Sequence, residues 1–394
     1  MSVKISSLVE SVGFPPIAEA MSWVKPQAGN RALLNMCQAV PSYPPAETLQ
    51  TEIARLAHEP NTGGYTDIFG IAPLRSAYAK HMSIDYATAI EPANVAITTG
   101  CNQAFSASIM AIAKAGDNVI IPAPYYFNHQ MWLTMMGIEI RAIPAFSDVI
   151  DHPRAPDAAP LIDSRTRAIV LCTPNNPTGA IYPSAELEAF YTLAKSANIM
   201  LILDETYKDF RPNAAAPHQL FNHPDWQNTL IQLYSFSKIY ALAGYRLGAM
   251  IAGPEILHEV AKILDCMTIC PPHITQRAVV FGLTELEDWK TEKKLVMKQR
   301  LDALRESFKT AGLGYRLVSS GAYFAYIKHP FAEPSKSVAK RLAQDNDLLC
   351  LPGSMFGPDQ ESYLRLAFAN VEAGRMVELS ERLIESQSQL RQTP

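Results

Sequence analysis

Three short polar segments in this chain each follow an apolar run with the composition of a buried β-strand. Lys238 follows the run 230–233, Asp204 follows the run 199–203, and a turn containing Asn176 follows a third run. Because the carboxyl ends of parallel strands meet at one edge of a sheet, we expect these side chains to converge there. A lone lysine at a strand end is usually a solvated charge, but beside a carboxylate and an amide it is a candidate Schiff-base nucleophile.

These groups match the requirements of pyridoxal phosphate chemistry, which needs an amine, a carboxylate, hydrogen-bond donors and an anion-binding turn. The amine attaches to the cofactor, the carboxylate keeps the ring nitrogen protonated, and the donors contact the ring oxygen. At Gly100 a strand passes into a helix pattern, which presents free backbone amides and the positive end of a helix dipole to an anion. The candidates for binding phosphate there are Gly100, Cys101, Asn102, Ser235, Ser237 and Arg246.

The composition is typical of a globular protein with a small-molecule ligand. The 394 residues include 34 basic and 38 acidic side chains, for a net charge of −4, and 48% are hydrophobic. With no long basic block, neither nucleic acid nor an anionic membrane is an expected partner. No run of about 18 apolar residues could span a membrane. The six scattered cysteines fit neither a disulfide scaffold nor a metal site, so we expect a cytoplasmic protein without a metal.

Short apolar runs alternate with longer amphipathic segments between about residues 90 and 255. This alternation predicts an α/β fold, and runs that are apolar on both faces predict a mostly parallel sheet flanked by helices on both sides. The predicted strands are 95–98, 118–121, 168–171, 199–203, 230–233 and 247–252.

The C-terminal part of the chain predicts a second, smaller unit. A charged amphipathic pattern over 289–311 indicates a long helix that bridges to it. The apolar runs 321–327, 348–351 and 363–368 predict a small sheet with flanking helices. We therefore expect a large cofactor domain over residues 48–285, and a smaller α+β domain built from the N-terminal arm, 1–47, and the C-terminal part, 286–394.

Taken in order, these motifs resemble those of the class I/II aminotransferases, the fold-type I enzymes that use pyridoxal phosphate. The resemblance extends over nearly the whole length of the chain. The motifs that carry it are Tyr65 to Gly70 with Leu74-Arg75, Thr99-Gly100, Pro124-Tyr125-Tyr126, Pro174 to Gly179, Asp204 to Tyr207, Ser235 to Lys238, Gly244-Tyr245-Arg246 and Arg365.

The resemblance implies specific roles for the polar residues at the strand ends. Lys238 would hold the cofactor as a Schiff base and, once displaced by the substrate, move the proton at the substrate Cα. Asp204 would pair with the protonated ring nitrogen, while Asn176 and Tyr207 would donate hydrogen bonds to the ring oxygen. Lys238, Asp204 and Tyr207 are therefore the expected catalytic residues.

Further contacts of the cofactor follow from the same resemblance. Tyr126 would stack on the ring face, with Tyr125 as the alternative. The phosphate would lie between the backbone near Gly100 and the guanidinium of Arg246. Tyr65 would reach this phosphate from a neighbouring subunit, so a homodimer with shared active sites is expected.

The resemblance also places the substrate carboxylate. Arg365 would bind it bidentately, with Asn176 and Ala39 close by. Many members of the family have glycine where this chain has Ala39, so less room is expected there. The Met- and Cys-rich segment 266–273 offers no arginine or lysine for a second carboxylate. We therefore expect a neutral, apolar or aromatic L-amino acid as donor and a 2-oxo acid as acceptor.

Two other classes of function use the same residues. A carbon–sulfur β-lyase or a decarboxylase would need the same lysine, aspartate and phosphate site, and no residue in the sequence separates these reactions from transamination. A non-catalytic effector-binding module would keep the cofactor but would need an attached DNA-binding unit. The sequence shows no basic helix-turn-helix pattern before residue 30 or after residue 390.

Overall fold

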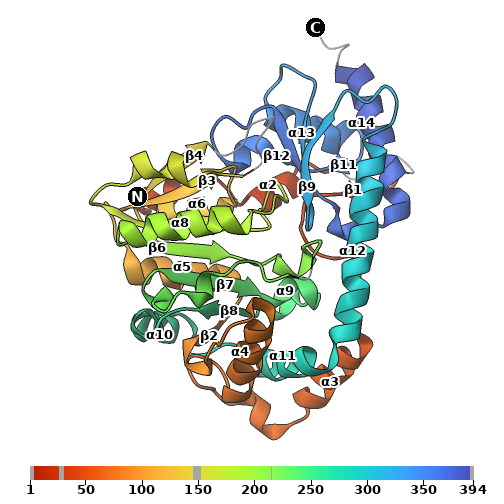
Figure 1. The fold of residues 1–394 in the computed structure, drawn as a ribbon. Helices are drawn as coiled ribbons and strands as arrows, with labels where there is room; N and C mark the ends of the chain where they lie inside the picture. Colours follow the sequence, from red (N-terminus) through yellow and green to blue (C-terminus); the bar gives the residue numbers. More distant parts are fainter. Residues whose placement is uncertain (1–3, 26–30, 145–151, 214, 391–394) are drawn as a thin grey trace.

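A seven-stranded sheet forms the centre of the protein in the computed structural model, which describes residues 4–25, 31–144, 152–213 and 215–390 (Figure 1). The strand order is β2-β8-β7-β6-β5-β3-β4, and only β8 runs antiparallel to its neighbours. The strands are β2 (Val95–Thr98), β3 (Asn118–Ala123), β4 (Glu139–Pro144), β5 (Thr166–Cys172), β6 (Met200–Asp204), β7 (Leu230–Ser235) and β8 (Gly248–Ile251).

Both faces of this sheet are covered by helices, as the apolar runs predicted. Alternate side chains of one strand point to opposite faces, so Ile169 packs with α8 whereas Val170 packs with α5 and α10. The helices on the first face are α4 (Ala72–Tyr86), α8 (Ser184–Ser196) and α11 (His273–Glu285), and those on the second are α5 (Cys101–Ile112) and α10 (Pro254–Thr268).

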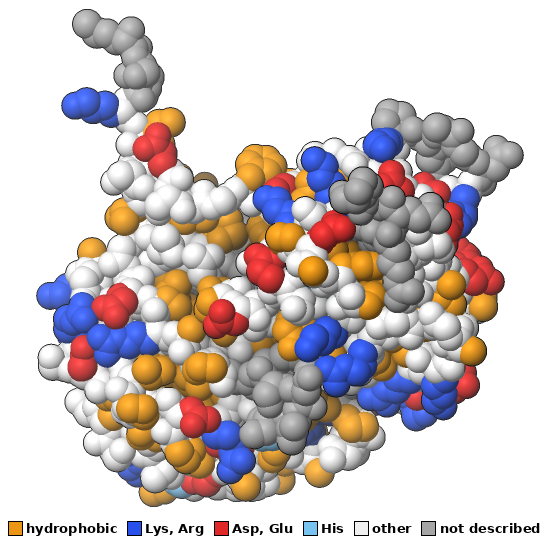
Figure 2. Space-filling model, turned by 90° about the horizontal axis from the view of Figure 1, so that it is seen from above, with side chains coloured by type: hydrophobic (Ala, Val, Ile, Leu, Met, Phe, Trp, Pro, Cys, Tyr) orange, Lys and Arg blue, Asp and Glu red, His pale blue; other side chains and the backbone are white. Residues whose placement is uncertain are grey.

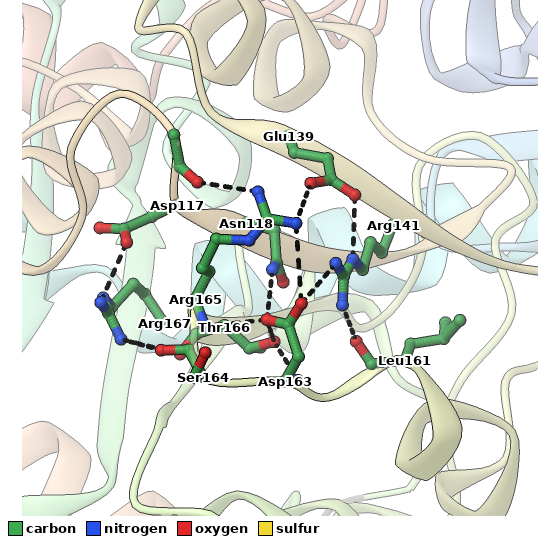
Figure 3. A network of polar contacts seen from close by, with 11 residues as sticks. Asp117, Asn118, Glu139, Arg141, Leu161, Asp163, Ser164, Arg165, Thr166 and Arg167 are labelled. Carbon is green, nitrogen blue, oxygen red and sulfur yellow. Dashed lines mark hydrogen bonds and ion pairs between the residues drawn. The ribbon is translucent and has the colours of Figure 1, made fainter.

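The edge strand β4 was not predicted, because its charged residues interrupt the apolar pattern. Figure 3 shows why they are there: they hold the amino ends of β3, β4 and β5 together. Arg141 bonds to Asp163 at 2.7 Å, Arg165 bonds to Glu139 at 2.9 Å, and the Asn118 amide donates to Asp163 at 2.9 Å. The hydrogen bonds from Asn118 and Arg141 hold the pKa of the Asp163 carboxyl below its ordinary value. This network lies at the end of the sheet opposite the polar strand ends.

A smaller antiparallel sheet with the order β12-β13-β10-β9 forms the second unit. The run 321–327 does not lie within one strand: the chain reverses at Ala322, whose φ is 47°, and the run is divided between β9 and β10. The N-terminal arm joins this unit because β1 pairs in parallel with β11. The strands are β1 (Leu34–Asn35), β9 (Arg316–Gly321), β10 (Phe324–Lys328), β11 (Leu348–Leu349), β12 (Leu351–Pro352) and β13 (Tyr363–Ala367).

The long helix α12 (Glu287–Ser307) connects the two units, and Figure 1 shows it running along one side of the molecule from α11 toward the small sheet. It ends before residue 311, the predicted end, because the chain turns after Ser307 and Gly312 has a φ of 82°. The other helices are α1 (Ser7–Glu10), α2 (Pro16–Met21), α3 (Glu47–Ala57), α6 (Phe127–Met135), α7 (Ala155–Ala158), α9 (Phe236–Ile239), α13 (Ser335–Asp345) and α14 (Met376–Leu390).

The surface agrees with the interspersed charge of the sequence. On the face seen in Figure 2, basic and acidic side chains lie among one another rather than in separate areas. Within the described ranges, no helix is both long and apolar enough to cross a membrane.

Candidate active site

A pocket opens at the carboxyl ends of β5, β6 and β7, beside the first turn of α5. All the residues expected to bind the cofactor line this pocket except Gly100 and Tyr65. Cys172 and Thr206 line it as well. The structure therefore brings together side chains that lie up to 145 positions apart, from Cys101 to Arg246.

Lys238 projects into this pocket from α9, the short helix that follows β7. Its Nζ donates a hydrogen bond to the Ala39 carbonyl oxygen at 2.9 Å and lies 5.8 Å from the centre of the Tyr207 ring. Burial lowers the pKa of Lys238 to about 8, and the charges of Arg246 and Arg365 act in the same direction. The amine is therefore available as a nucleophile near neutral pH.

Asp204 lies at the end of β6 with a buried carboxylate. Thr206 donates its backbone N–H to Oδ1 at 3.0 Å, and His129 Nε2 lies 3.3 Å from Oδ2. Burial alone raises the pKa of Asp204, but the hydrogen bonds from His129 and Thr206 hold it below its ordinary value. The pocket thus contains a carboxylate that stays ionised and can face a cationic ring nitrogen.

The first turn of α5 and Arg246 together form a site for an anion. Gly100 precedes the helix with a φ of 86°, and a Cβ atom there would collide with the guanidinium of Arg246. A glycine at this position is therefore required for the close approach of the arginine. Arg246 Nη1 donates to the Ala243 carbonyl oxygen at 2.9 Å, which orients the guanidinium. A cation beside free helix amides suits a phosphate group.

Arg365, on β13, is 1% exposed and lies beside this pocket. Its Nη1 donates to Asn176 Oδ1 at 3.2 Å, and its Nη2 donates to the Cys37 carbonyl oxygen. The rings of Phe324 and Phe356 lie 5.1 and 5.2 Å from the guanidinium carbon. The buried Nε has no acceptor within the described residues. A buried, oriented cation with a free donor is suited to bind a carboxylate.

The comparison with protein families agrees with this arrangement. A family model described as "Aminotransferase class I and II" matches residues 31–383. The chain belongs to this family. Its activity is therefore the transfer of amino groups between amino acids and 2-oxo acids, on a fold-type I scaffold.

Individual relatives of this aminotransferase match over most of their length. The aspartate aminotransferase of Sulfolobus acidocaldarius is 26% identical over 350 residues, which cover 86% of each chain. The valine–pyruvate aminotransferase of Mycobacterium tuberculosis is 28% identical over 369 residues, covering 91% of this chain and 92% of that protein. A crystal structure of an aminotransferase from Mycobacterium tuberculosis superimposes with a TM-score of 0.86 at 27% identity, covering 98% of this chain and 100% of the other.

The structure of the aminotransferase adds contacts to Asp204 that the sequence analysis missed. His129 lies on α6, stacked on Phe105 with a centroid distance of 4.1 Å. The available signal was a lone histidine in an apolar helix, three positions after Tyr126. The Cys101 thiol, considered before only for its backbone, lies 3.7 Å from Asp204 Oδ1. Asp204 is thus held from two sides by residues distant in sequence.

The fold places the two adjacent tyrosines differently. Tyr126 lines the pocket, whereas Tyr125 lies against Gly357 and donates its backbone N–H to the Phe356 carbonyl oxygen at 2.8 Å. Asn128 donates to the Tyr126 hydroxyl at 2.8 Å. Tyr126 is therefore the tyrosine of this pair that is placed to contact a ring in the pocket.

The loop that carries Asn176 is anchored to the small sheet. A Cβ atom on Gly179 would collide with the backbone of Gly321, so the two glycines allow the loop and the end of β9 to touch. The Asn175 amide donates to Thr178 Oγ1 at 3.1 Å and stabilises the turn. This contact lets Asn176 bond to Arg365 while it lines the same pocket as Lys238.

Tyr65 is not brought to the pocket of its own chain. Its side chain is 81% exposed. The adjacent Thr66 donates its backbone N–H to Cys270 Sγ at 3.4 Å, and Gln276 Nε2 donates to Thr66 Oγ1 at 3.1 Å. These bonds fix the segment that presents Tyr65 on the surface.

Proposed function

We propose that this aminotransferase holds pyridoxal 5′-phosphate in the pocket and moves the amino group of a neutral L-amino acid to a 2-oxo acid in a ping-pong cycle. The observation that carries the proposal is the shared location of the Lys238 amine, the ionised Asp204 carboxylate and the Arg246 anion site. An amine, a carboxylate and an anion site in one pocket are what the cofactor requires.

The remaining residues of the pocket fit the same cofactor. Arg246, Ser235, Ser237 and the amides that begin at Cys101 would hold the phosphate. Burial raises the pKa of Tyr207 well above its ordinary value, so its hydroxyl keeps its proton and can donate a hydrogen bond. Asn176 offers a second donor for the ring oxygen, and Tyr126 offers a face for the ring. When bound, the cofactor supplies a ring that accepts electrons from the substrate Cα.

The protein supplies the proton transfers and the orientation of the substrate. Arg365 would bind the α-carboxylate and fix the direction of the Cα–H bond. Lys238 would remove and return the proton at Cα, because a general base works best with a pKa near the operating pH. Two functions of Lys238, attachment of the cofactor and proton transfer, thus depend on the same lowered pKa.

The lowered pKa gives a testable pH dependence for cofactor attachment. The neutral amine is the nucleophile, so the attachment rate of cofactor to the apoenzyme should rise about tenfold between pH 7 and 9 and then level off. The attachment can be followed by absorbance, with Nα-acetyl-lysine as the control amine. Relative to that control, a rate that keeps rising to pH 10 would contradict the lowered pKa of Lys238.

The proposed neutral substrate rests on the cations around the pocket. Within the described residues, those that line it are Lys238 and Arg246, and each already has a proposed role. Arg365 is proposed to bind the α-carboxylate, and the segment 266–273 has no arginine or lysine. The two relatives described above are named for aspartate, an acidic amino acid, and for valine, a branched-chain one. Their names therefore do not agree on a substrate class, and the proposal rests on the residues of this chain. A second carboxylate would be buried here without a partner.

We expect leucine, phenylalanine or methionine to be used at least tenfold better than aspartate or glutamate, as judged by kcat/KM. A factor of ten corresponds to about 1.4 kcal/mol, which is at the low end of the cost of burying an unpaired polar group. The measurement is a donor series with a fixed 2-oxo acid. A preference for aspartate and glutamate would refute the neutral-substrate proposal while leaving the transaminase intact.

The proposal includes a homodimer in which Tyr65 reaches the phosphate of the partner subunit. Supporting it, the apolar side chains of Met267 and Ile269 are 41% and 43% exposed, and a hydrogen bond from the Thr66 backbone N–H to Cys270 Sγ joins their segment to the one that carries Tyr65. We also propose a cytoplasmic location, because all six cysteines are free thiols.

The experiment that tests the whole proposal is the absorption spectrum of the purified protein, recorded before and after single amino acids are added without an oxo acid. Conversion of the bound cofactor to its pyridoxamine form would establish the first half of the cycle. Release of pyruvate with ammonia, or of an amine, would replace transamination by a β-lyase or decarboxylase reaction. Failure to bind added cofactor would refute the assignment of the pocket.

A further inference from the structure

A second cavity of about 660 Å³ lies between the large domain and α12. Its walls are α4, residues 208–213 with Ala215 and Pro217, α12 and the end of β9. A hydrophobic cluster that includes Tyr207, Met297 and Ala322 separates it from the cofactor pocket. Tyr207 lines the cofactor pocket, whereas Met297 and Ala322 line the second cavity. The two spaces are therefore distinct and share one wall.

The carboxylates that line this cavity are already paired with lysines. Because Asp85 and Asp209 share one lysine, these groups keep a single net negative charge, which the other cations of the cavity exceed. The pairs are Asp85 and Asp209 with Lys208, Glu287 with Lys290, and Asp302 with Lys298.

The structure also argues against a metal ion here. Ligand atoms of His81, Asp85 and Asp209 lie within 4.8 Å of one another. However, the Lys208 ammonium bonds directly to Asp85 and lies 3.8 Å from Asp209. Burial, together with the charge of Lys208, lowers the pKa of His81 to about 4, so this histidine adds no positive charge to the cavity at pH 7. The Lys208 ammonium thus already occupies the position beside these carboxylates that a metal ion would need.

Three further cations line the cavity without a carboxylate partner among the described residues. Lys294 lines the cavity and forms no ion pair within 4 Å among the described residues, although its charge helps to lower the pKa of Asp209 and Glu287. Arg211 donates to the Ala215 carbonyl oxygen, and its buried Nε has no acceptor. Arg305 donates to the hydroxyl and carbonyl oxygens of Ser320 at 3.0 and 3.1 Å. The cavity is thus lined by six cations and four carboxylates, and this net charge of +2 favours an anion.

Apolar side chains make up the other part of the lining. Ile84, on α4, is 71% exposed and Leu295, on α12, is 56% exposed. Phe210, Leu301 and the ring of Pro217 line the same space. Large apolar side chains that stay exposed beside unpaired cations are typical of a pocket for a ligand with an apolar body and a charged head group.

We propose that this cavity binds a small organic anion with an apolar body, in which a carboxylate, sulfonate or phosphate head group is bound by Arg211 and Lys294. Such a ligand touches α12 and the large domain at once. It therefore stabilises the contact between α12 and the large domain and raises the melting temperature of the enzyme. No residue of the proposed active site is needed for this binding.

The test is a fluorescence titration of the holoenzyme with 1-anilinonaphthalene-8-sulfonate, an organic anion with an apolar body. Lys294→Gln and Arg211→Gln are each expected to raise the Kd about tenfold, the effect of losing one charge-assisted hydrogen bond. Lys309→Gln is the matched control, because Lys309 is exposed, pairs with Glu306 and lies outside the cavity. Its Kd should equal that of the unchanged protein.

Two further variants test whether the probe binds in this cavity or elsewhere on the protein. Leu295→Glu, at an exposed position, should also weaken binding, whereas Arg365→Lys should not. Competition with phenyl phosphate, phenylacetate and inorganic phosphate then identifies the head group. The proposal is overturned if the probe does not bind, if Lys294→Gln and Arg211→Gln leave the Kd unchanged, or if Arg365→Lys or Lys309→Gln weakens binding equally.

Discussion

Replacement of Lys238 by alanine is expected to lower kcat by at least about 10⁴-fold, because it removes the amine proposed to attach the cofactor and to move the proton at Cα. Lys238 is the lysine that lines the described pocket, so no neighbouring amine there can replace it. The measurement is steady-state turnover, together with mass spectrometry after borohydride reduction. The reduced protein should lose the mass of the covalently attached cofactor.

Two control variants separate chemistry from charge and folding. Lys238→Arg keeps a cation but has no nucleophilic amine near neutral pH, so it should be as inactive as the alanine variant. Lys195→Ala removes a surface lysine that pairs with Asp225 and should leave kcat unchanged. More than about 1% of the original kcat in Lys238→Ala, a smaller loss than proton-transfer catalysis alone predicts, would show that another group performs the reaction.

Arg365→Lys is expected to lower kcat/KM for an L-amino acid about a hundredfold. The substitution keeps the charge but loses the two-pronged geometry that the free Nε and the oriented guanidinium provide. A hundredfold loss equals about 2.7 kcal/mol, within the range for removing a partner from a buried charge pair. The same variant should not lose activity toward an amine that lacks an α-carboxylate, and the ratio of the two rates is the measurement.

Arg382→Lys is the matched control, because Arg382 is also a buried arginine of the small domain. It donates to the Ala32 carbonyl oxygen at 2.9 Å and pairs with Glu378 at 2.8 Å, away from the pocket. We expect this variant to melt at a lower temperature with an unchanged kcat/KM. Equal losses of kcat/KM in the two variants would mean that Arg365 supports the fold rather than the substrate.

Much of the site followed from the sequence, because polar residues at the ends of buried strands need no long-range information to be noticed. Asp204 stands directly after an apolar run and Lys238 follows another within five residues, and parallel strands place their carboxyl ends at one edge. The central strands were predictable for the same reason, since continuous apolar runs indicate a sheet covered on both faces. The edge strand β4 was not predictable in this way, because its charged side chains bond to the polar network around Asp163 instead of packing into a core.

Contacts between distant segments were decided by the tertiary structure alone. Asn176 and Arg365 are 189 positions apart, and their bond depends on the close approach of Gly179 and Gly321. Local sequence also did not indicate that His129 holds Asp204, because an isolated histidine in an apolar helix has no pattern that names its partner.

The sequence alone thus indicated which polar residues gather at the pocket and how the large sheet is layered, because strand patterns and residue types are local properties. The fold decided which tyrosine faces the pocket, where the run 321–327 reverses, and which charges remain unpaired beside α12. These features depend on packing between elements that are far apart in the chain. Residue type can be read from the sequence, whereas the contacts between distant elements form only when the large and the small unit pack against each other.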